Sequence, residues 1–265
     1  MARSAQATSQ PLDFLADLYD VAFDWDVGEE VEWLTGRLGR SCQRVLEPGC
    51  GSGRYLEALA RRGLEVVGID GSPVMVELAR RRLAKSSLPG EAVLDDMTDF
   101  DLRGSFDGAV CAIATIQHLA REELGRHLSC MARHLAEDSR YMVQLALYDP
   151  SGRQHLPSSS WEESRGELSL RIDWTTEEVD LAAGRALQRS RIEILAGPRQ
   201  GQIVVEDHAM TAWTPETWGA AIAASPFAID RVFDGAEEPP VPVEEHATGG
   251  LIWHELRREA RATER

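Results

Sequence analysis

The sequence predicts an α/β protein with a doubly wound, Rossmann-like sheet of seven strands and an antiparallel β insertion after the fifth strand. Three observations predict this class. Short apolar strands alternate with helical segments between residues 44 and 147, a glycine-rich turn follows the first strand, and runs of alternating apolar and polar residues then replace that rhythm. Strands that alternate with helices are typical of parallel sheets, whereas period-two runs are typical of antiparallel ones.

Residues 1–40 are predicted to form an N-terminal helical cap. Apolar residues recur at helical spacing from Pro11 to Trp25 and again from Glu29 to Leu38. Residues 1–10 are small and polar, and we expect them to be disordered.

Residues 41–150 are predicted to form the cofactor-binding core. Ser72 and Pro73 are typical of a helix start, and Gly63 is typical of a helix end. The expected strands cover 44–47, 64–70, 92–94, 106–112 and 140–147, and the expected helices cover 55–62, 72–85 and 121–135.

Residues 151–212 are predicted to form an antiparallel lid or substrate region. Leu168, Leu170, Ile172 and Trp174 alternate there with polar residues. Residues 213–265 should complete the core, with a helix at 214–223, strands at 227–233 and 251–256, and a Pro-rich loop at 237–242.

Composition argues against several kinds of partner. The chain has 44 acidic and 28 basic residues, for a net charge of −16, which disfavours nucleic acid. Four cysteines without paired spacing predict neither a disulfide framework nor a zinc site. No signal segment and no apolar run of about 18 residues is found, so we expect a cytoplasmic protein without a membrane anchor.

The most informative segment is Glu47-Pro48-Gly49-Cys50-Gly51-Ser52-Gly53, between the first strand and its helix. Glycines allow a tight turn and close approach to a ligand, and the next helix offers free N–H groups. A dinucleotide fingerprint would need glycine where the chain has Arg54, and the carboxylate of Glu47 opposes a pyrophosphate. The segment therefore favours a cationic ligand.

This pattern resembles the first motif of the class I S-adenosylmethionine-dependent methyltransferases, and the resemblance extends over about residues 40–150. Asp70, at the end of the second strand, matches the family's acidic residue that accepts hydrogen bonds from both ribose hydroxyls. Asp96 and Met97 match the pair that reads adenine, and residues 106–110 resemble the fourth-strand motif. The chain departs from many members at residues 136–139, which replace a Pro-Gly-Gly turn.

The resemblance implies S-adenosylmethionine as the cofactor and methyl transfer as the activity. Asp95 is the weaker candidate for adenine, because neighbouring side chains on a strand point apart. The expected cofactor-binding residues are Glu47, Gly49, Cys50, Gly51, Gly53, Asp70, Gly71, Asp96, Met97 and Ala112.

Two residues resemble the acceptor side of small-molecule N-methyltransferases of the glycine and amino-sugar types. Tyr19 lies in the N-terminal helical segment, which covers the methionine end of the cofactor in such enzymes. His118 lies just past the fourth strand, and in such enzymes the loop after this strand borders the substrate. An amine must be neutral to attack a methyl group, so a nearby proton acceptor is useful. We expect Tyr19 to be a pocket residue and His118 to act as the base or to contact the substrate. The alternative interpretation of Tyr19 is a core aromatic residue, and that of His118 is a helix-capping or cofactor-contacting histidine.

The insertion should supply the rest of the acceptor site. An aromatic wall with a few polar groups is typical of a small-ligand pocket, although tryptophan is more often a core residue. We expect Asp207 and His208 to lie nearest the substrate. The other candidates are Trp161, Trp174, Trp213, Trp218, Arg171, Arg189, Arg191 and Glu206.

Two alternatives to amine methylation stay open. One is C- or O-methylation of a small metabolite. In a metal-assisted form of this reaction, His118, His208 and His254 would hold a metal ion that binds an α-keto acid substrate. The spacing of these histidines in the sequence does not support such a site, so no metal ligand is predicted. The other is an inactive cofactor-binding scaffold. The expected partner is a small molecule, and a homodimer stays open.

Overall fold

The computed structural model describes residues 12–151, 156, 158–235, 240 and 248–259. The segments predicted to be disordered (1–10) and Pro-rich (237–242, except Pro240) lie outside the described residues. Among those residues, no helix is both long and apolar enough to cross a membrane.

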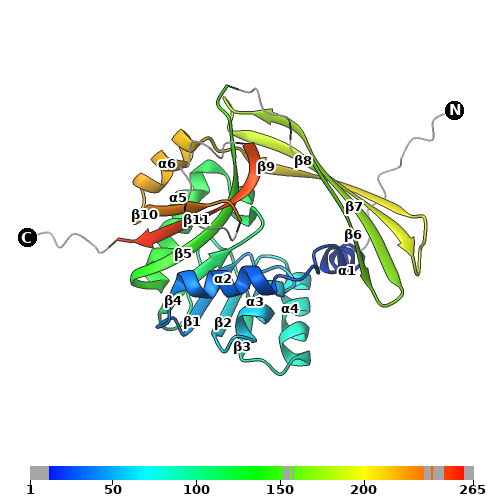
Figure 1. Ribbon diagram of the computed structural model, residues 1–265, viewed down its shortest axis with the longest axis horizontal. Coiled ribbons are helices and arrows are strands. Elements are labelled where there is room, and N and C mark those ends of the chain that lie inside the picture. Colours follow the sequence, from blue (N-terminus) through cyan, green and yellow to red (C-terminus); the bar gives the residue numbers. More distant parts are fainter. Residues whose placement is uncertain (1–11, 152–155, 157, 236–239, 241–247, 260–265) are drawn as a thin grey trace, which may run out of the picture.

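A seven-stranded sheet forms the core, in the order β10-β11-β5-β4-β1-β2-β3 (Figure 1). Strands β1 to β5 run parallel, and β11 runs antiparallel to both β5 and β10. The strands are β1 (Arg44–Pro48), β2 (Glu65–Asp70), β3 (Gly90–Leu94), β4 (Phe106–Cys111), β5 (Leu135–Tyr148), β10 (Phe227–Phe233) and β11 (Thr248–Arg258). The predicted α/β fold with a seven-stranded, Rossmann-like sheet is confirmed.

Helices cover both faces of this sheet. Val31 and Leu34 of α2 join Leu56 of α3 in the buried cluster on one face, which also includes α4. Leu128 of α5 and Trp218 of α6 belong to the cluster on the other face. The helices are α2 (Gly28–Leu38), α3 (Arg54–Ala60), α4 (Pro73–Lys85), η1 (Thr115–His118), α5 (Arg121–His134) and α6 (Pro215–Ala223). Burial on both faces explains why the central strands are nearly all apolar.

The insertion forms a separate four-stranded antiparallel sheet in the order β6-β7-β8-β9. Its strands are β6 (Ser158–Arg165), β7 (Leu168–Asp180), β8 (Arg185–Ala196) and β9 (Ile203–Thr211). We call this the insertion sheet; it is the antiparallel insertion that the sequence predicts.

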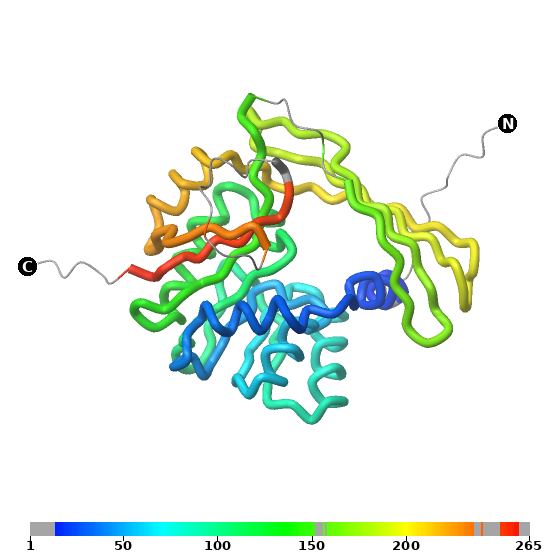
Figure 2. Tube along the Cα trace, in the orientation of Figure 1, coloured from blue at the N-terminus to red at the C-terminus, as the bar shows by residue number. Residues whose placement is uncertain are grey.

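Helix α1 (Leu12–Ala22) lies between the insertion sheet and the core (Figure 2). Leu18 and Val21 pack against Ile172 and Ile192 of the insertion sheet. On its other side, Asp20 pairs with Arg82 of α4 at 2.7 Å. One amphipathic helix thus connects the two parts of the molecule.

Candidate active site

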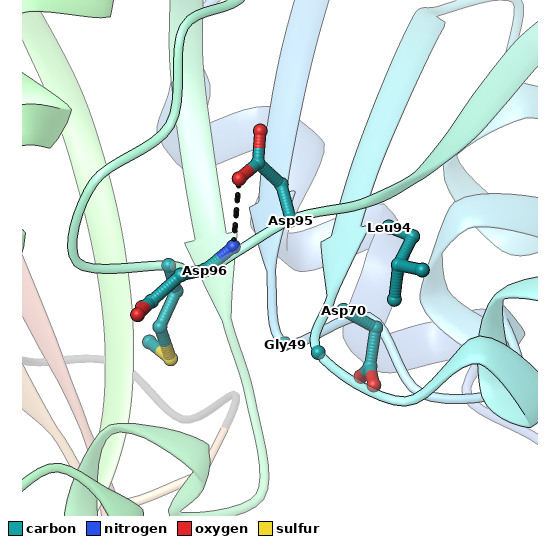
Figure 3. Close-up of a pocket in the computed structure, with 7 residues that line it drawn as sticks. Gly49, Asp70, Leu94, Asp95 and Asp96 are labelled. Carbon is teal, nitrogen blue, oxygen red and sulfur yellow. Dashed lines mark hydrogen bonds between the residues drawn. The ribbon is translucent and has the colours of Figure 1, made fainter.

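The carboxyl ends of β1, β2 and β3 border a cavity of about 570 Å³ (Figure 3). In open parallel sheets, ligands bind at this edge. The cavity is lined by Gly49, Asp70, Gly71, Leu94, Asp95, Asp96 and Met97. Five of the predicted cofactor residues therefore meet at one place: Gly49, Asp70, Gly71, Asp96 and Met97.

The turn after β1 requires its glycines. Gly49, Gly51 and Gly53 have φ values of 69°, 53° and 82°, in the left-handed region that other residues rarely adopt. A Cβ atom on Gly49 would collide with Thr115, and one on Gly53 would lie 2.9 Å from the Cβ of Ala79. A Cβ on Gly51 would meet nothing within 4 Å. Gly51 thus leaves open space at the turn, as a bound ligand would need.

Asp70 organises this turn. One carboxylate oxygen accepts the backbone N–H of Gly51 and the other accepts that of Ser72, each at 2.8 Å. Each oxygen has further lone pairs, so the carboxylate can still accept hydrogen bonds from a ligand in the cavity that it lines.

Asp95 and Asp96 differ in what their carboxylates bind. Asp95 accepts the backbone N–H of Asp96 at 2.9 Å, and Figure 3 shows their side chains pointing apart. Asp96 accepts the backbone N–H of Thr98 at 2.8 Å, and this bond lowers the pKa of the Asp96 carboxyl. Asp96 is exposed, and its carboxylate can accept a further donor from a ligand.

Glu47 and Arg54 lie at the two ends of the turn, and each has one buried side-chain atom without a hydrogen-bond partner among the described residues. Glu47 is 4% exposed, and its Oε2 atom has no partner among the described residues. Burial raises the pKa of Glu47 well above its ordinary value, although the charge of Arg54 opposes this. Arg54 stacks on the Trp25 ring at 3.9 Å, and its Nη2 atom also lacks a partner in the described structure.

These features fit S-adenosylmethionine. The methionine part of this cofactor has an ammonium group, which would supply the missing partner of Glu47. It also has a carboxylate, which would supply the missing partner of Arg54. The open side of Gly51 and the acceptors Asp70 and Asp96 suit the adenosine part.

Two predicted cofactor residues can contribute only their backbone. The Cys50 thiol points beneath the turn toward Gly68, whose added Cβ would lie 2.7 Å from the sulfur. Ala112 is buried just after β4, and its carbonyl accepts the N–H of Thr115. All four cysteines are free and buried.

A second polar group joins α1 to the insertion sheet. The Tyr19 hydroxyl lies 3.0 Å from both Ser190 Oγ and His208 Nε2, and the last two atoms are 2.9 Å apart. The Trp174 ring stacks on His208 with 4.7 Å between ring centroids. We call Tyr19, Trp174, Ser190 and His208 the acceptor cluster. It brings together three residues that the sequence predicts, Tyr19, Trp174 and His208.

His118 interacts electrostatically with both this cluster and the cavity. It ends the short helix η1 after β4, and part of its ring is open to solvent. Partial burial and the charge of His208 lower its pKa, whereas the charge of Asp70 acts in the opposite direction. Because both His208 and Asp70 act on it electrostatically, His118 is near both sides of the site.

The expectation that Asp207 lies with His208 nearest the substrate is wrong for Asp207. Neighbouring side chains in a strand point to opposite faces. Asp207 therefore lies on the far face of β9, where it pairs with Arg189 at 2.7 Å. Trp213 and Trp218 are buried in the core rather than in the acceptor cluster.

The three histidines of the metal hypothesis do not converge. His254 is fully buried in β11 beside Trp218, and burial lowers its pKa to about 3. In the part of the chain that the structure describes, no group of three or more His, Cys, Asp or Glu side chains could hold a metal ion.

Two residues of the candidate site, Arg54 and Ser190, were not expected from the sequence. Arg54 adjoins the glycine motif, so its position was a usable signal. Ser190 could be found only from the register of β8, where it pairs with Trp174 on one side and Glu206 on the other.

Replacing Gly51 with valine is expected to abolish binding of S-adenosylhomocysteine, because the side chain would fill the open side of the turn. Gly63→Val is the matched control: Gly63 also has a positive φ and open surroundings, but it lies between α3 and the start of β2, whereas the cavity is at the carboxyl end of β2. Both variants should lose about 1–2 kcal/mol of stability from backbone strain. Calorimetric titration should show lost binding only for Gly51→Val; normal affinity there would contradict the assignment.

Comparisons with known proteins agree with this geometry. Residues 45–138 match the family model described as a methyltransferase domain. The chain is 27% identical over 243 residues to the dTDP-3-amino-3,6-dideoxy-alpha-D-glucopyranose N,N-dimethyltransferase of Streptomyces fradiae, a match that covers 87% of this chain and 91% of that protein. It is 33% identical over 129 residues to the dTDP-4-amino-2,3,4,6-tetradeoxy-D-glucose N,N-dimethyltransferase of Saccharopolyspora spinosa, covering 46% and 50% of the two chains.

Solved structures share the fold. DesVI of Streptomyces venezuelae has a TM-score of 0.73 at 18% identity, and the match covers 93% of this chain and 98% of that one. The sugar N-methyltransferase KedS8 of a Streptoalloteichus species has a TM-score of 0.70 at 20% identity, covering 98% and 99%. The matched methyltransferase domain, its glycine turn and the cavity identify this chain as an S-adenosylmethionine-dependent methyltransferase.

Proposed function

We propose that this enzyme methylates an amine nitrogen of a small molecule, with His118, Tyr19 and His208 on the acceptor side. The observation that carries the proposal is the pair His118 and His208: the two rings interact electrostatically, and His118 also interacts with Asp70, which lines the cofactor cavity. Burial lowers the pKa of both His118 and His208, so both are neutral near pH 7 and can accept a proton. An amine that arrives as an ammonium must lose a proton before it can attack.

The core of residues 41–150 would hold the cofactor. We assign the methionine ammonium to Glu47 and its carboxylate to Arg54, because both have unpaired buried atoms. Asp70 would accept the ribose hydroxyls, and Asp96 with the backbone of Met97 would read adenine. When bound, S-adenosylmethionine supplies a methyl group that its sulfonium already activates.

The protein's own residues then have two tasks. The acceptor cluster, in the region of residues 151–212 together with α1, would orient the acceptor. Tyr19 is held by Ser190 and His208, and burial raises its pKa, so its hydroxyl keeps its proton and can donate a hydrogen bond. His118 would take the proton of the amine. The amino-sugar N-methyltransferases among the relatives support an amine acceptor.

The test compares acceptor classes. The enzyme is incubated with S-adenosylmethionine and panels of amino sugars, phenols or sugar hydroxyls, and α-keto acids, with and without a chelator. We expect S-adenosylhomocysteine and an N-methylated product with amines only, whether or not the chelator is present. Methylation of oxygen or carbon acceptors alone would contradict the proposal. Binding of S-adenosylmethionine without turnover of any panel would instead favour a scaffold.

A further inference from the structure

The two faces of the insertion sheet carry different chemistry. We call the face that packs on α1 the inner face. Cross-strand neighbours on it include Trp174, Ser190 and Glu206 in one row, and Gln188 and His208 in the next. Trp174 donates its indole N–H to Gln188 at 2.9 Å, and Ser190 and His208 bind Tyr19. The middle of the inner face is therefore neutral and aromatic, except for one carboxylate.

The outer face holds the arginines of the central strands, and each is paired there. Arg171 pairs with Glu162 at 2.6 Å, and Arg191 pairs with Asp173 at 3.2 Å. Arg189 pairs with Asp207 at 2.7 Å. On the inner side of the described strands, the arginine is Arg165, which already bonds to Asp20 of α1 and to Asp24 just after that helix. No free cation therefore stands beside the acceptor cluster on the described part of this sheet.

Glu206 is the carboxylate beside the acceptor cluster on the inner face; Glu163 also lies on this face, but on the edge strand β6. It is half-buried, and no ion pair to it is found among the described residues. It lies close enough to Tyr19 and His208 for its charge to raise the pKa of both groups. A carboxylate in this setting stabilises positive charge and opposes negative charge.

Aromatic rings lie on the same face of the insertion sheet as this carboxylate, one strand further away. Trp174 contacts Phe23 edge to face, with 5.8 Å between ring centroids, and Phe23 contacts Trp161 with 5.9 Å between ring centroids. Tryptophan faces attract ammonium groups, and an aromatic group beside a carboxylate is a common way to bind alkylated amines.

We propose that the acceptor is an amine without phosphate groups, and that Glu206 selects it by binding its ammonium form. This inference rests on the proposed function. It differs from what the names of two relatives suggest, since those enzymes act on dTDP-linked amino sugars. A pyrophosphate at the inner face would meet Glu206 and no free arginine or lysine of the described strands.

The test uses binding, so that it does not depend on turnover. Two probes are titrated by calorimetry into the protein loaded with S-adenosylhomocysteine: methyl 3-amino-3,6-dideoxy-α-D-glucopyranoside, which has an amine and no phosphate, and dTDP, which has phosphates and no amine. The proteins are wild type, Glu206→Gln, and the matched control Asp207→Asn. The control removes the same charge one position along β9, but from the outer face.

We expect the amino glycoside to bind the wild type, and dTDP to show no binding at about 1 mM, a limit of about −4 kcal/mol. Glu206→Gln should weaken glycoside binding about tenfold or more, whereas Asp207→Asn should change it by less than about twofold. Equal affinity in Glu206→Gln, tighter binding of dTDP than of the glycoside, or no glycoside binding at all would overturn the inference.

Turnover separates this inference from the proposed function. If the glycoside binds as expected but methyl transfer is found only at oxygen or carbon acceptors, the proposed amine activity fails while the charge preference stands. If amines are methylated but the dTDP-linked amino sugar is preferred over the methyl glycoside, the amine activity stands and the inference fails.

Discussion

Replacing Asp70 with alanine is expected to weaken binding of S-adenosylhomocysteine by about 10²–10⁴-fold. We assign two ribose hydrogen bonds to this carboxylate, and each bond to a charged group contributes about 1.5–3 kcal/mol. The carboxylate also accepts the N–H groups of Gly51 and Ser72. The variant should therefore also unfold at a lower temperature, because the turn loses both bonds.

Asp95→Ala is the control for this experiment. Asp95 lines the same cavity and has the same charge, but its carboxylate binds the backbone of Asp96. Its loss should weaken binding by less than about tenfold. Calorimetric titration measures both affinities, and circular dichroism verifies folding. A folded Asp70→Ala variant with unchanged affinity would refute the ribose assignment; a large loss in Asp95→Ala would move the adenine contact from Asp96 to Asp95.

The cofactor side of the site could be predicted from the sequence because its parts are local. Glu47 and the glycines belong to one continuous segment, and Asp70 and Asp96 follow the ends of the next two strands. The carboxyl ends of neighbouring parallel strands meet at one edge of a sheet, so order along the chain translates directly into proximity. The cavity at this edge follows from that rule alone.

The acceptor side could be predicted only in part, because it depends on long-range packing. Tyr19 is 171 residues from Ser190 and 189 residues from His208 in the chain. Their contact requires α1 to pack on one particular face of the insertion sheet. The resemblance to N-methyltransferases indicated Tyr19, but nothing local to Ser190 indicates its role.

The error over Asp207 has a physical cause in β9. Ile203 and Val205 are both 47% exposed, although apolar residues usually mark the buried face of a strand. They share a face with Asp207, so the apolar pattern of β9 wrongly predicts that the side chain of Asp207 lies on the buried face. Which residues of β9 face inward is known only from its pairing with β8, where Ser190 lies opposite Glu206 and Gln188 lies opposite His208.

His254 shows a similar limit. Its sequence context does not reveal that β11 lies between β5 and β10, with the ring buried beside Trp218. A histidine in the sequence is compatible with a ligand, a base or a core residue, and only the position of its strand decides among these.

Replacing His118 with alanine is expected to lower kcat by about 10²–10⁴-fold, the usual contribution of a general base, while binding of S-adenosylmethionine is retained. The ring interacts electrostatically with Asp70, which lines the cofactor cavity, and with His208 of the acceptor cluster, and none of its predicted tasks requires it to hold the cofactor. Stopped assays with the amine acceptor give kcat, and titration with S-adenosylhomocysteine gives the affinity.

The pH profile distinguishes a base from a residue that only positions the acceptor. The lowered pKa of His118 means that the ring loses its proton at a lower pH than ordinary histidine, whose pKa is about 6.5. The kcat of the wild type should therefore rise with pH through that lowered pKa and be level by neutral pH, since only the neutral ring accepts a proton. His118→Asn keeps a hydrogen-bonding side chain that does not titrate, so it should lose this rise as His118→Ala does. A variant with wild-type turnover and an unchanged profile would transfer the role to Tyr19 or His208, and a variant that no longer binds S-adenosylhomocysteine would place His118 in the cofactor site.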